Sequence, residues 1–569
     1  MSGDALVYDF ANTTDSQSSV FLKKDWLSII DDNTTNYSGN QVTINTSAIS
    51  NSSKYCDMRQ AYLQIPLLYT LTGTVTHAAN GLMPATAAKS ADYALGLKNW
   101  VGGSVIHNLT AEINGTSVIQ QTNLLPLYNQ FKLLTTLSHS DYAIFSSIGF
   151  AKDEALSVRF HVANNADGKG VCNNQNALAF PTVTAKHNSY LTGNEGFTRR
   201  QMFFNFDLDG IVGDAANTFG TATNGLISEA FARQLYKSHI ITKINSTAGG
   251  QKGIFQQAIN VTCHLRHLSS FFDAMPLLKG TFCKLILGVS NSSVEFSVAG
   301  SVITGTTVTN SLGGLNPIML ASCLAGNGNK TLPDDTYIAS LSVGAKCLNT
   351  TQLAIAGIKQ GTMAQSVSLQ VPSYVFTPQM EMAYLKSPVK KINYTDLYQF
   401  TIQNVASSSQ INALVSNGIK NLKKIIVMPL LNATGNKGLH QLQSPYCSGV
   451  LAPYAHIGQF NVVISGANVF QNAQRYTYES FLHQLYGINS INSGLTDGMS
   501  SGLISQQDFE SGYPYYVADV SRMLDIERDV PKSVTITGQN LSLQEVDYIV
   551  FCEYGAEVSF DVLTGSRVA

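Results

Sequence analysis

Residues 260–287, NVTCHLRHLSSFFDAMPLLKGTFCKLIL, say most about the fold of this chain. From Val261 to Arg266 apolar and polar side chains alternate, which is the period of a half-buried strand. LSSFFDAM then allows two helical turns, which one of its serines can cap and Pro276 can end. A second, nearly all-apolar strand is predicted over residues 282–287. A short helix between two strands is typical of a β-sandwich whose connections carry small helices.

A similar unit is predicted later in the chain. YQFTIQNV (398–405) and KKIIVMPLL (423–431) have the character of strands, and the amphipathic INALVSNGIKNL (411–422) between them is predicted to be a helix. Two such units suggest a duplicated β domain. The other helices predicted are short, at residues 124–137, 227–236 and 475–487, so the fold class is all-β with short helices.

The composition limits the classes of function. The chain has 569 residues, and charged residues make up only 13%, about half the usual share. A surface with so few charges is expected to be covered by partners. The net charge of −2 and the lack of a basic arm argue against direct nucleic-acid binding. We expect neither a secretory signal nor a transmembrane segment, since no apolar run approaches about 20 residues.

The cysteines show no metal-binding or disulfide spacing. All eight are scattered, and the default prediction is a set of buried free thiols. They are residues Cys56, Cys172, Cys263, Cys283, Cys323, Cys347, Cys447 and Cys552. Asn-x-Ser/Thr triplets are frequent in a chain this rich in Asn, Ser and Thr, and without a secretory signal they do not imply glycosylation.

Three groups of residues could carry chemistry, and each has a simpler structural interpretation. His264 and His267, beside Cys263, would point to opposite faces of a strand and could not share one metal ion. Asp207-Leu208-Asp209-Gly210 and Asp167-Gly168 resemble calcium loops but lack the further ligands, so turns are predicted.

The densest acidic group is in QQDFESGYPYYVADVSR, with Asp508, Glu510 and Asp519. A glycosidase pair could lie there. A structural pair of Asp519 with Arg522 is the simpler hypothesis. No nucleotide-binding or nucleophile-elbow motif is present. We therefore predict no catalytic, cofactor-binding or metal site and no enzyme activity.

The domain prediction divides the chain into three parts: an N-terminal arm (1–35), a first sandwich (36–300) and a second sandwich (301–569). The boundary lies in the Ser/Thr/Gly-rich stretch 291–310, which is either a strand pair or the crossing between domains. Long polar excursions are predicted at residues 77–103, 150–225 and 310–365, and such loops carry contacts on a rigid scaffold.

Several segments, in one order, resemble a known family. These are GIFQQAINVTCHLRHLSSFFDAMPLLKGTFCKLIL (253–287), SLQVPSYVFTPQMEMAYLKSPVKKINYTDLYQF (368–400), NGIKNLKKIIVMPLL (417–431), NVFQNAQRYTYESFLHQLYGINSINSG (468–494) and LISQQDFESGYPYYVADVSR (503–522). Together they are similar to major capsid proteins of virophages and polinton-like viruses, of the double jelly-roll lineage. The resemblance extends from about residue 100 to the end of the sequence and is weakest where loops dominate.

The resemblance implies a double jelly roll, two eight-stranded β-sandwiches side by side. It implies a structural subunit that forms pseudo-hexameric homotrimers, the capsomers of an icosahedral capsid in the virion, assembled in the host cell. The implied partners are neighbouring capsomers, the minor (penton) capsid protein and cement proteins, with no cofactor. The excursions would supply exterior or inter-subunit contacts, and the arm would lie inside the shell or against a neighbour.

The alternative function is a carbohydrate-binding viral fibre or lectin-like jelly-roll protein. The 26 Phe and 25 Tyr against two Trp suit sheet cores and interfaces better than a sugar platform built on tryptophan. A minor vertex protein is the third hypothesis, but the double layout argues against it, because that protein is normally a single, shorter jelly roll.

Overall fold

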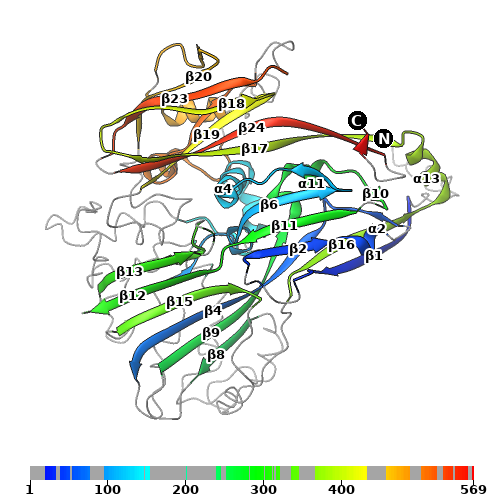
Figure 1. Ribbon diagram of the computed structural model, residues 1–569, viewed down its shortest axis with the longest axis horizontal. Coiled ribbons are helices and arrows are strands. Elements are labelled where there is room, and N and C mark those ends of the chain that lie inside the picture. The colour runs from blue at the N-terminus through cyan, green and yellow to red at the C-terminus, as the bar shows by residue number, and fades with distance from the viewer. Residues whose placement is uncertain are drawn as a thin grey trace, which may run out of the picture.

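The computed structural model describes residues 20–33, 37, 39–50, 54–76, 95–145, 148–153, 196, 200, 239–244, 252–280, 282–299, 302–310, 312, 315–320, 335–344, 366–431, 456–473, 475–486, 501–521, 529–542, 545–561 and 567–568. These residues form two stacked β-sandwiches with short helices between and around them (Figure 1). The predicted fold class, all-β with short helices, is confirmed.

The C-terminal sandwich has the strand order of a jelly roll. In one sheet the first strand pairs with the last and the last with the third. In the other sheet the second strand pairs with the next-to-last, which pairs with the fourth, as in two interleaved Greek keys. One sheet runs β17 (Val389–Val405), β24 (Val546–Asp561), β19 (Leu422–Leu431) and β22 (Tyr516–Asp519), with β25 (Arg567–Val568) added to β24. The other runs β18 (Gln410–Ile419), β23 (Lys532–Asn540), β20 (Ile457–Ile464) and β21 (Ala467–Asn468).

Aromatic side chains join these two sheets. Tyr516 on β22 and Phe460 on β20 lie 5.3 Å apart between ring centroids, and the backbone N–H of Ile457 donates to the Tyr516 hydroxyl at 2.8 Å. Both rings are buried. The hydroxyl therefore has a partner inside the core, as buried tyrosines require.

The N-terminal sandwich repeats this pairing pattern within residues 41–289, among the strands that are longer than three residues. The first pairs with the last and the last with the third, and the second pairs with the next-to-last. One sheet runs β2 (Gln41–Asn45), β11 (Cys283–Val289), β6 (Ile106–Ile113) and β7 (Thr116–Ile119). In the other, β4 (Tyr62–Thr76) pairs with β9 (Lys252–His264), and β9 pairs with β8 (His239–Ile244).

The free side of β4 carries further strands, so this sheet has ten described strands, more than the eight-stranded sandwich that was predicted. Two groups join β4 there, one through β15 and one through β16. They are β15 (Asp335–Val343), β12 (Ser292–Ala299) and β13 (Val302–Asn310), and β16 (Ser368–Phe376), β3 (Tyr55–Cys56), β10 (Leu278–Lys279) and β1 (Phe21–Ile30). A separate pair consists of β5 (Leu95–Leu97) and β14 (Ile318–Leu320).

This extension moves the passage between the sandwiches away from residue 300. The Ser/Thr/Gly-rich stretch is a hairpin of β12 and β13 that hydrogen-bonds into the first sandwich. The chain crosses to the second sandwich only between Phe376 and Val389, through α13 (Pro378–Leu385). The jelly-roll strand set itself closes at Val289, because β11 is its last strand.

Three local predictions are wrong. Residues 411–422 form strand β18 instead of a helix, so the unit at 398–431 consists of three strands and does not repeat the unit at 260–287. Part of the predicted N-terminal arm is strand β1, antiparallel to β16. Two of the predicted excursions contain ordered elements: residues 95–103 form β5 and most of the buried helix α3 (Val101–Ser104), and residues 335–343 form strand β15 of the ten-stranded sheet.

Most of the remaining short elements agree with prediction. Alternation along residues 109–113 followed by Asn114-Gly115 predicts a hairpin, and β6 and β7 form it with positive φ at both turn residues. Two predicted helices form, α4 (Leu125–Thr136) and α15 (Tyr478–Tyr486), and the one predicted at 227–236 lies outside the described residues. Ser269 caps α11 (Ser270–Ala274) by accepting from the N–H of Phe271. The others are α2 (Ser47–Ser50), α5 (His139–Phe145), α10 (Leu265–Leu268) and α17 (Gln506–Ser511).

Candidate assembly surfaces

Two helices of the first sandwich fill the space between the sandwiches. Helix α4 is buried along nearly its whole length and lies between the two sets of sheets (Figure 1). Its Phe131 ring meets Tyr515 edge to face at 5.0 Å, and the Tyr128 hydroxyl donates to Glu553 at 2.9 Å. Phe271 of α11 meets Tyr394 of β17 in the same edge-to-face manner, at 5.0 Å. The two sandwiches therefore share one continuous core.

Polar contacts cover the edge of β17 where it faces the first sandwich. The Ser270 hydroxyl donates to the Thr395 carbonyl at 2.7 Å and accepts from the Thr395 N–H at 3.0 Å. Thr122 donates its hydroxyl to the Leu397 carbonyl at 3.1 Å. Between them, burial raises the pKa of Asp396, which accepts from the Tyr554 hydroxyl at 3.0 Å. The first sandwich thus supplies side-chain partners for the backbone of a strand in the second.

A small cavity of about 20 Å³ remains at this junction. It is large enough for about one water molecule. Asn129 and Lys132 of α4 line it on one side, and Asp396 lines it on the other. Its size excludes a ligand larger than water.

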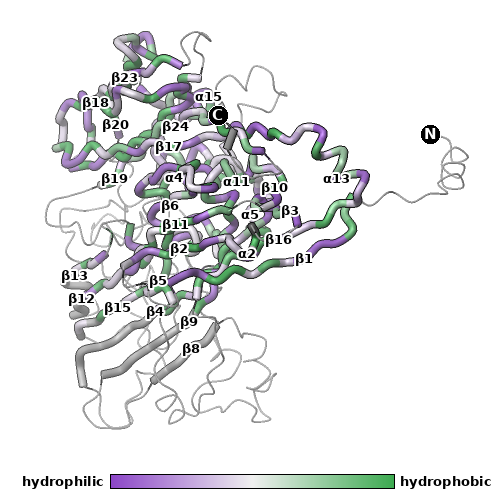
Figure 2. Tube along the Cα trace, turned by 45° about the vertical axis from the view of Figure 1, so that its right-hand side comes forward, coloured by the Kyte–Doolittle hydropathy of each residue, from purple (hydrophilic) through white to green (hydrophobic). Residues whose placement is uncertain are grey.

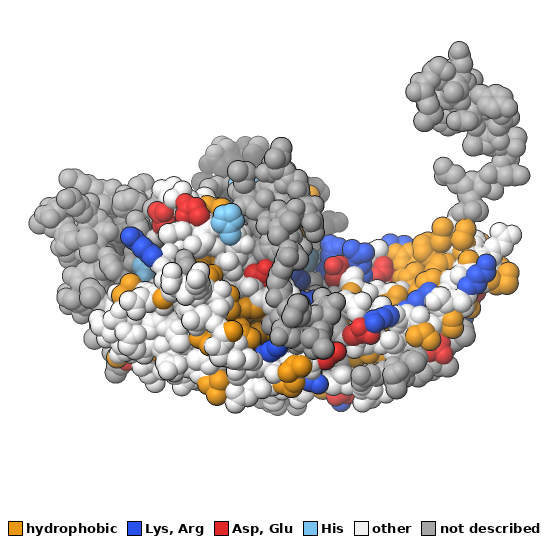
Figure 3. Space-filling view, turned by 90° about the horizontal axis from the view of Figure 1, so that it is seen from above, with side chains coloured by type: hydrophobic (Ala, Val, Ile, Leu, Met, Phe, Trp, Pro, Cys, Tyr) orange, Lys and Arg blue, Asp and Glu red, His pale blue; other side chains and the backbone are white. Residues whose placement is uncertain are grey.

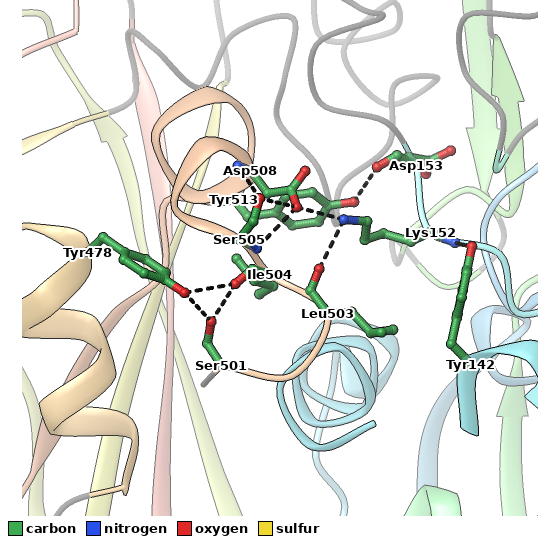
Figure 4. Close-up of polar contacts among 10 residues, drawn as sticks. All are labelled: Tyr142, Lys152, Asp153, Tyr478, Ser501, Leu503, Ile504, Ser505, Asp508 and Tyr513. Atoms are coloured by element: carbon green, nitrogen blue, oxygen red, sulfur yellow. Dashed lines mark hydrogen bonds and ion pairs between the residues drawn. The ribbon is translucent and has the colours of Figure 1, made fainter. Parts of the chain in front are cut away.

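A second polar cluster ties the segment after α5 to the second sandwich (Figure 4). The Lys152 ammonium donates to Asp508 at 2.7 Å and to the Leu503 carbonyl at 3.0 Å. The Tyr513 hydroxyl donates to the Asp153 carbonyl at 2.6 Å. The Lys152 and Asp508 side chains are only 14% and 16% exposed, so this ion pair is largely shielded from water. It fixes one sandwich relative to the other.

Next to this cluster lie two buried basic side chains, Arg200 and Lys98. Arg200 pairs with Asp153 at 2.6 Å, and both side chains are almost fully buried. Burial lowers the pKa of Lys98 to about 7, an effect that the nearby Asp153 carboxylate opposes. These charges sit in otherwise apolar surroundings, where only a partner makes them tolerable.

The outer face of β1 exposes large apolar side chains. Leu22, Trp26 and Ile30 follow at spacings of four, so they lie on one face of the strand, and each is more than half exposed. The strand pairs with β16 on one edge, and among the described residues no strand pairs with the other. An exposed edge with an apolar face is a site where another chain can associate.

Helix α13 lies beside this strand and has no buried residue. Figure 2 shows β1, β16 and α13 standing out from the body as one extension. Hydrophobic side chains gather at the end of the extension in Figure 3. Met382 of α13 is 67% exposed. Lys23, which is mostly exposed, and other charges lie along the extension.

The histidines of the opening stretch lie differently from the prediction. His264 ends β9 and His267 lies on α10, so the change from strand to helix brings the rings to 5.4 Å instead of turning them apart. His267 packs against Phe145 at 5.1 Å and Trp100 at 6.1 Å. Burial, helped by nearby positive charge, lowers the pKa of His267 to about 3, so the ring is neutral near pH 7.

The acidic group has structural partners. Asp508 forms a capping box with Ser505 at the start of α17 in addition to its pair with Lys152. Glu510 accepts from Gln506 one turn earlier, and Asp519 accepts from the N–H of Ser521. Arg522 and the two calcium-like turns lie outside the described residues, so those hypotheses stay predictions.

The described part of the chain contains no cluster of three or more metal-ligating side chains. Among its helices none is both long and apolar enough to cross a bilayer. Cys56, Cys263, Cys283 and Cys552 are buried free thiols, as predicted, and burial raises the pKa of each. The other four cysteines lie outside the described residues.

Sequence reasoning missed the residues that join the sandwiches. Lys152, Tyr128 and Glu553 are far apart in sequence, and only the fold brings them to their partners. One signal was available. In a chain with so few charges, a lone charge inside an apolar stretch, such as Lys98 in LGLKNW or Asp396 in NYTDLY, marks a buried group with a specific partner.

No protein-family model matches the chain, and no curated protein matches it. Among solved structures it is similar to one from the Sputnik virophage, with 11% identity, a TM-score of 0.49, and coverage of 98% of this chain and 90% of that one. It is similar to the mavirus major capsid protein (9% identity, TM-score 0.40, 98% and 94% covered). It is also similar to the Faustovirus major capsid protein (10% identity, TM-score 0.41, 97% and 94% covered). These likenesses are distant, so the function of this chain has to be argued from its own topology and surface.

Proposed function

We propose that this chain is the major capsid protein of an icosahedral virus, a structural subunit that forms pseudo-hexameric homotrimers in the capsid shell. The observation that carries the proposal is the repeated strand pairing: β2-β11-β6 in the first sandwich matches β17-β24-β19 in the second. One chain therefore presents two similar lobes. Three chains around a threefold axis would present six, which is an outline that tiles a closed shell.

The junction between the lobes supports the proposal. A shell subunit has to hold its lobes at a fixed angle, because neighbouring subunits contact both. The shared core of α4 and α11 and the shielded Lys152–Asp508 pair meet that need. A flexible linker between binding modules would have left the two cores separate.

The surface supports it as well. The outer face of β1 and the helix α13 leave exposed apolar side chains on an extension that no other described part of the chain covers. Obligate interfaces bury more than about 2,000 Å² and are rich in such side chains. Neighbouring capsomers, the penton protein and cement proteins are the partners that we propose for these surfaces, and the capsid shell is the proposed location.

Light scattering after size-exclusion chromatography tests the proposal. The expected mass is that of three chains of 61.3 kDa. Negative-stain images of the same fraction should show particles with six lobes. A monodisperse monomer that binds sugars would contradict the proposal and favour the lectin-like alternative.

A further inference from the structure

One side of the second sandwich is built from an uncharged stretch of sequence. Residues 397–419 contain no Asp, Glu, Lys, Arg or His. They cover the second half of β17, the turn at 406–409 and all of β18. Natural proteins usually protect the outer strands of a sheet with charged side chains, lysine above all. This pair of strands lacks that protection.

Both strands lie at the border of their sheets. In the described residues β17 pairs only with β24, and β18 pairs only with β23, so each has one free edge. The turn at 406–409 connects them directly, and the Tyr398 hydroxyl donates to the Val415 carbonyl at 3.4 Å. The two free edges therefore lie on the same side. We call residues 398–419 the uncharged wall.

The wall continues the junction between the sandwiches. Up to Leu397 the edge of β17 is covered by Ser270 and Thr122 of the first sandwich. From Tyr398 onward no described element of the chain covers it. The same strand edge is thus an interface in its first half, and in its second half no described residue covers it.

The side chains of the wall have the character of an interface core. Leu414 is 52% exposed and Tyr398 is 39% exposed, while Phe400 and Ile402 are only partly buried. Apart from Ala406, the other exposed side chains are amides and hydroxyls. Interface cores are depleted in charge and enriched in aromatic residues. A nucleic acid or an anionic membrane would need Lys or Arg, which the wall lacks.

The chain carries a second uncharged edge that could face it. Strand β13 borders the ten-stranded sheet and, among the described strands, pairs only with β12. It lies within residues 296–329, which also contain no charged side chain. Contact between two different edges of identical chains is heterologous, and such contacts close into rings when the rotation allows. Neither edge would have to desolvate a charge.

We infer that the uncharged wall is where a second copy of this chain docks, so that its free strand edges become an inter-subunit contact. The inference rests on the proposed function, since it names the surface through which the capsomer forms. The occupant is another copy because a matching uncharged edge is present in the same chain.

Leu414→Asp tests the inference. It places a charge at the centre of the wall on a side chain that is already half exposed, so the monomer should still fold and keep the circular dichroism spectrum of the parent chain. Burying that charge at an interface should weaken association about 100-fold, through the cost of desolvating an unpaired carboxylate. Asn412→Asp adds the same charge to an exposed side chain with almost no change in shape and should weaken association about 10-fold.

Ile144→Asp is the matched control, because Ile144 is 70% exposed and lies on α5, outside the wall. It should leave association unchanged. Mass by light scattering over a dilution series gives the dissociation constants, and hydrogen exchange should show residues 398–419 protected in the oligomer and exchanging in Leu414→Asp.

The outcomes separate the inference from the proposed function. A trimeric parent chain whose Leu414→Asp variant keeps its mass, with rapid exchange in residues 398–419, would overturn the inference and leave the capsid function standing. A parent chain that is monomeric at every concentration would overturn both. A folded variant that dissociates while Ile144→Asp does not would support the inference.

Discussion

The ion pair between Lys152 and Asp508 allows a quantitative test of how the two sandwiches are joined. Lys152→Met removes the ammonium and leaves Asp508 with the N–H and hydroxyl of Ser505, at 3.1 and 2.8 Å. A hydrogen bond to a charged group contributes about 1.5–3 kcal/mol, and both side chains are mostly buried, so we expect a loss of about 2 kcal/mol. Asp508→Asn also weakens the capping box and should cost about 3 kcal/mol.

The double variant isolates the pair. If Lys152 and Asp508 interact directly, the double variant should cost about 3 kcal/mol, which leaves a coupling energy of about 2 kcal/mol. Unfolding in guanidinium at fixed protein concentration, followed by fluorescence, measures each free energy. Lys391 and Glu557 provide the control, since they also form an ion pair but are more than half exposed. Their coupling should stay below about 0.5–1 kcal/mol. A coupling for Lys152–Asp508 as small as that of the control pair would refute the reasoning.

Four further outcomes follow from the fold. Phe271→Ala should destabilise the chain by about 3–5 kcal/mol in the same unfolding assay, because its buried ring bridges α11 and β17; a cost below about 1 kcal/mol would contradict that role. Gly502→Ala should lower the melting temperature, since Gly502 has φ +69° and an added Cβ would come within 2.6 Å of the Leu134 carbonyl oxygen; an unchanged melting temperature would show that the loop can shift. Because the pKa of His267 is lowered when folded, the unfolded chain binds more protons between pH 6.5 and about 3. Stability should therefore fall across that window on acidification, and less steeply in His267→Phe; parallel slopes would argue against a buried neutral ring. Iodoacetamide at pH 8 should leave Cys56, Cys263, Cys283 and Cys552 unmodified in the folded protein and label them after unfolding, as peptide mass spectrometry can read; labelling in the folded state would show that these sites are open.

The sequence predicted a strand well where the apolar period allowed a single interpretation. Alternation along residues 109–113 with Asn114-Gly115 left only a hairpin, and that is what forms. The helix predicted at residues 411–422 was wrong for a specific reason. Ile411, Val415 and Ile419 are the buried positions, and spacings of four fit one face of a helix and one face of a strand equally. The free edge of β23 decided between them, and pairing across more than 100 residues leaves no local signal.

The place where the chain passes between the sandwiches could not be read from the sequence for a different reason. Loss of charge and richness in Ser, Thr and Gly at 291–310 are properties of a linker and also of a flat, uncharged strand pair. Here β12 and β13 extend a sheet whose core strand β4 lies more than 200 residues earlier. The assembly surfaces also depend on pairing between strands that are far apart in sequence. The absence of charge in 397–419 is visible in the sequence, but only the sheet order places it on two free edges.

An electron cryomicroscopy reconstruction of the purified chain would show directly whether it forms a capsomer. We predict three copies around a threefold axis, with six lobes and with β17 and β18 of each copy against its neighbour. Isolated two-lobed monomers, or a twofold dimer that leaves residues 398–419 open to solvent, would contradict this prediction.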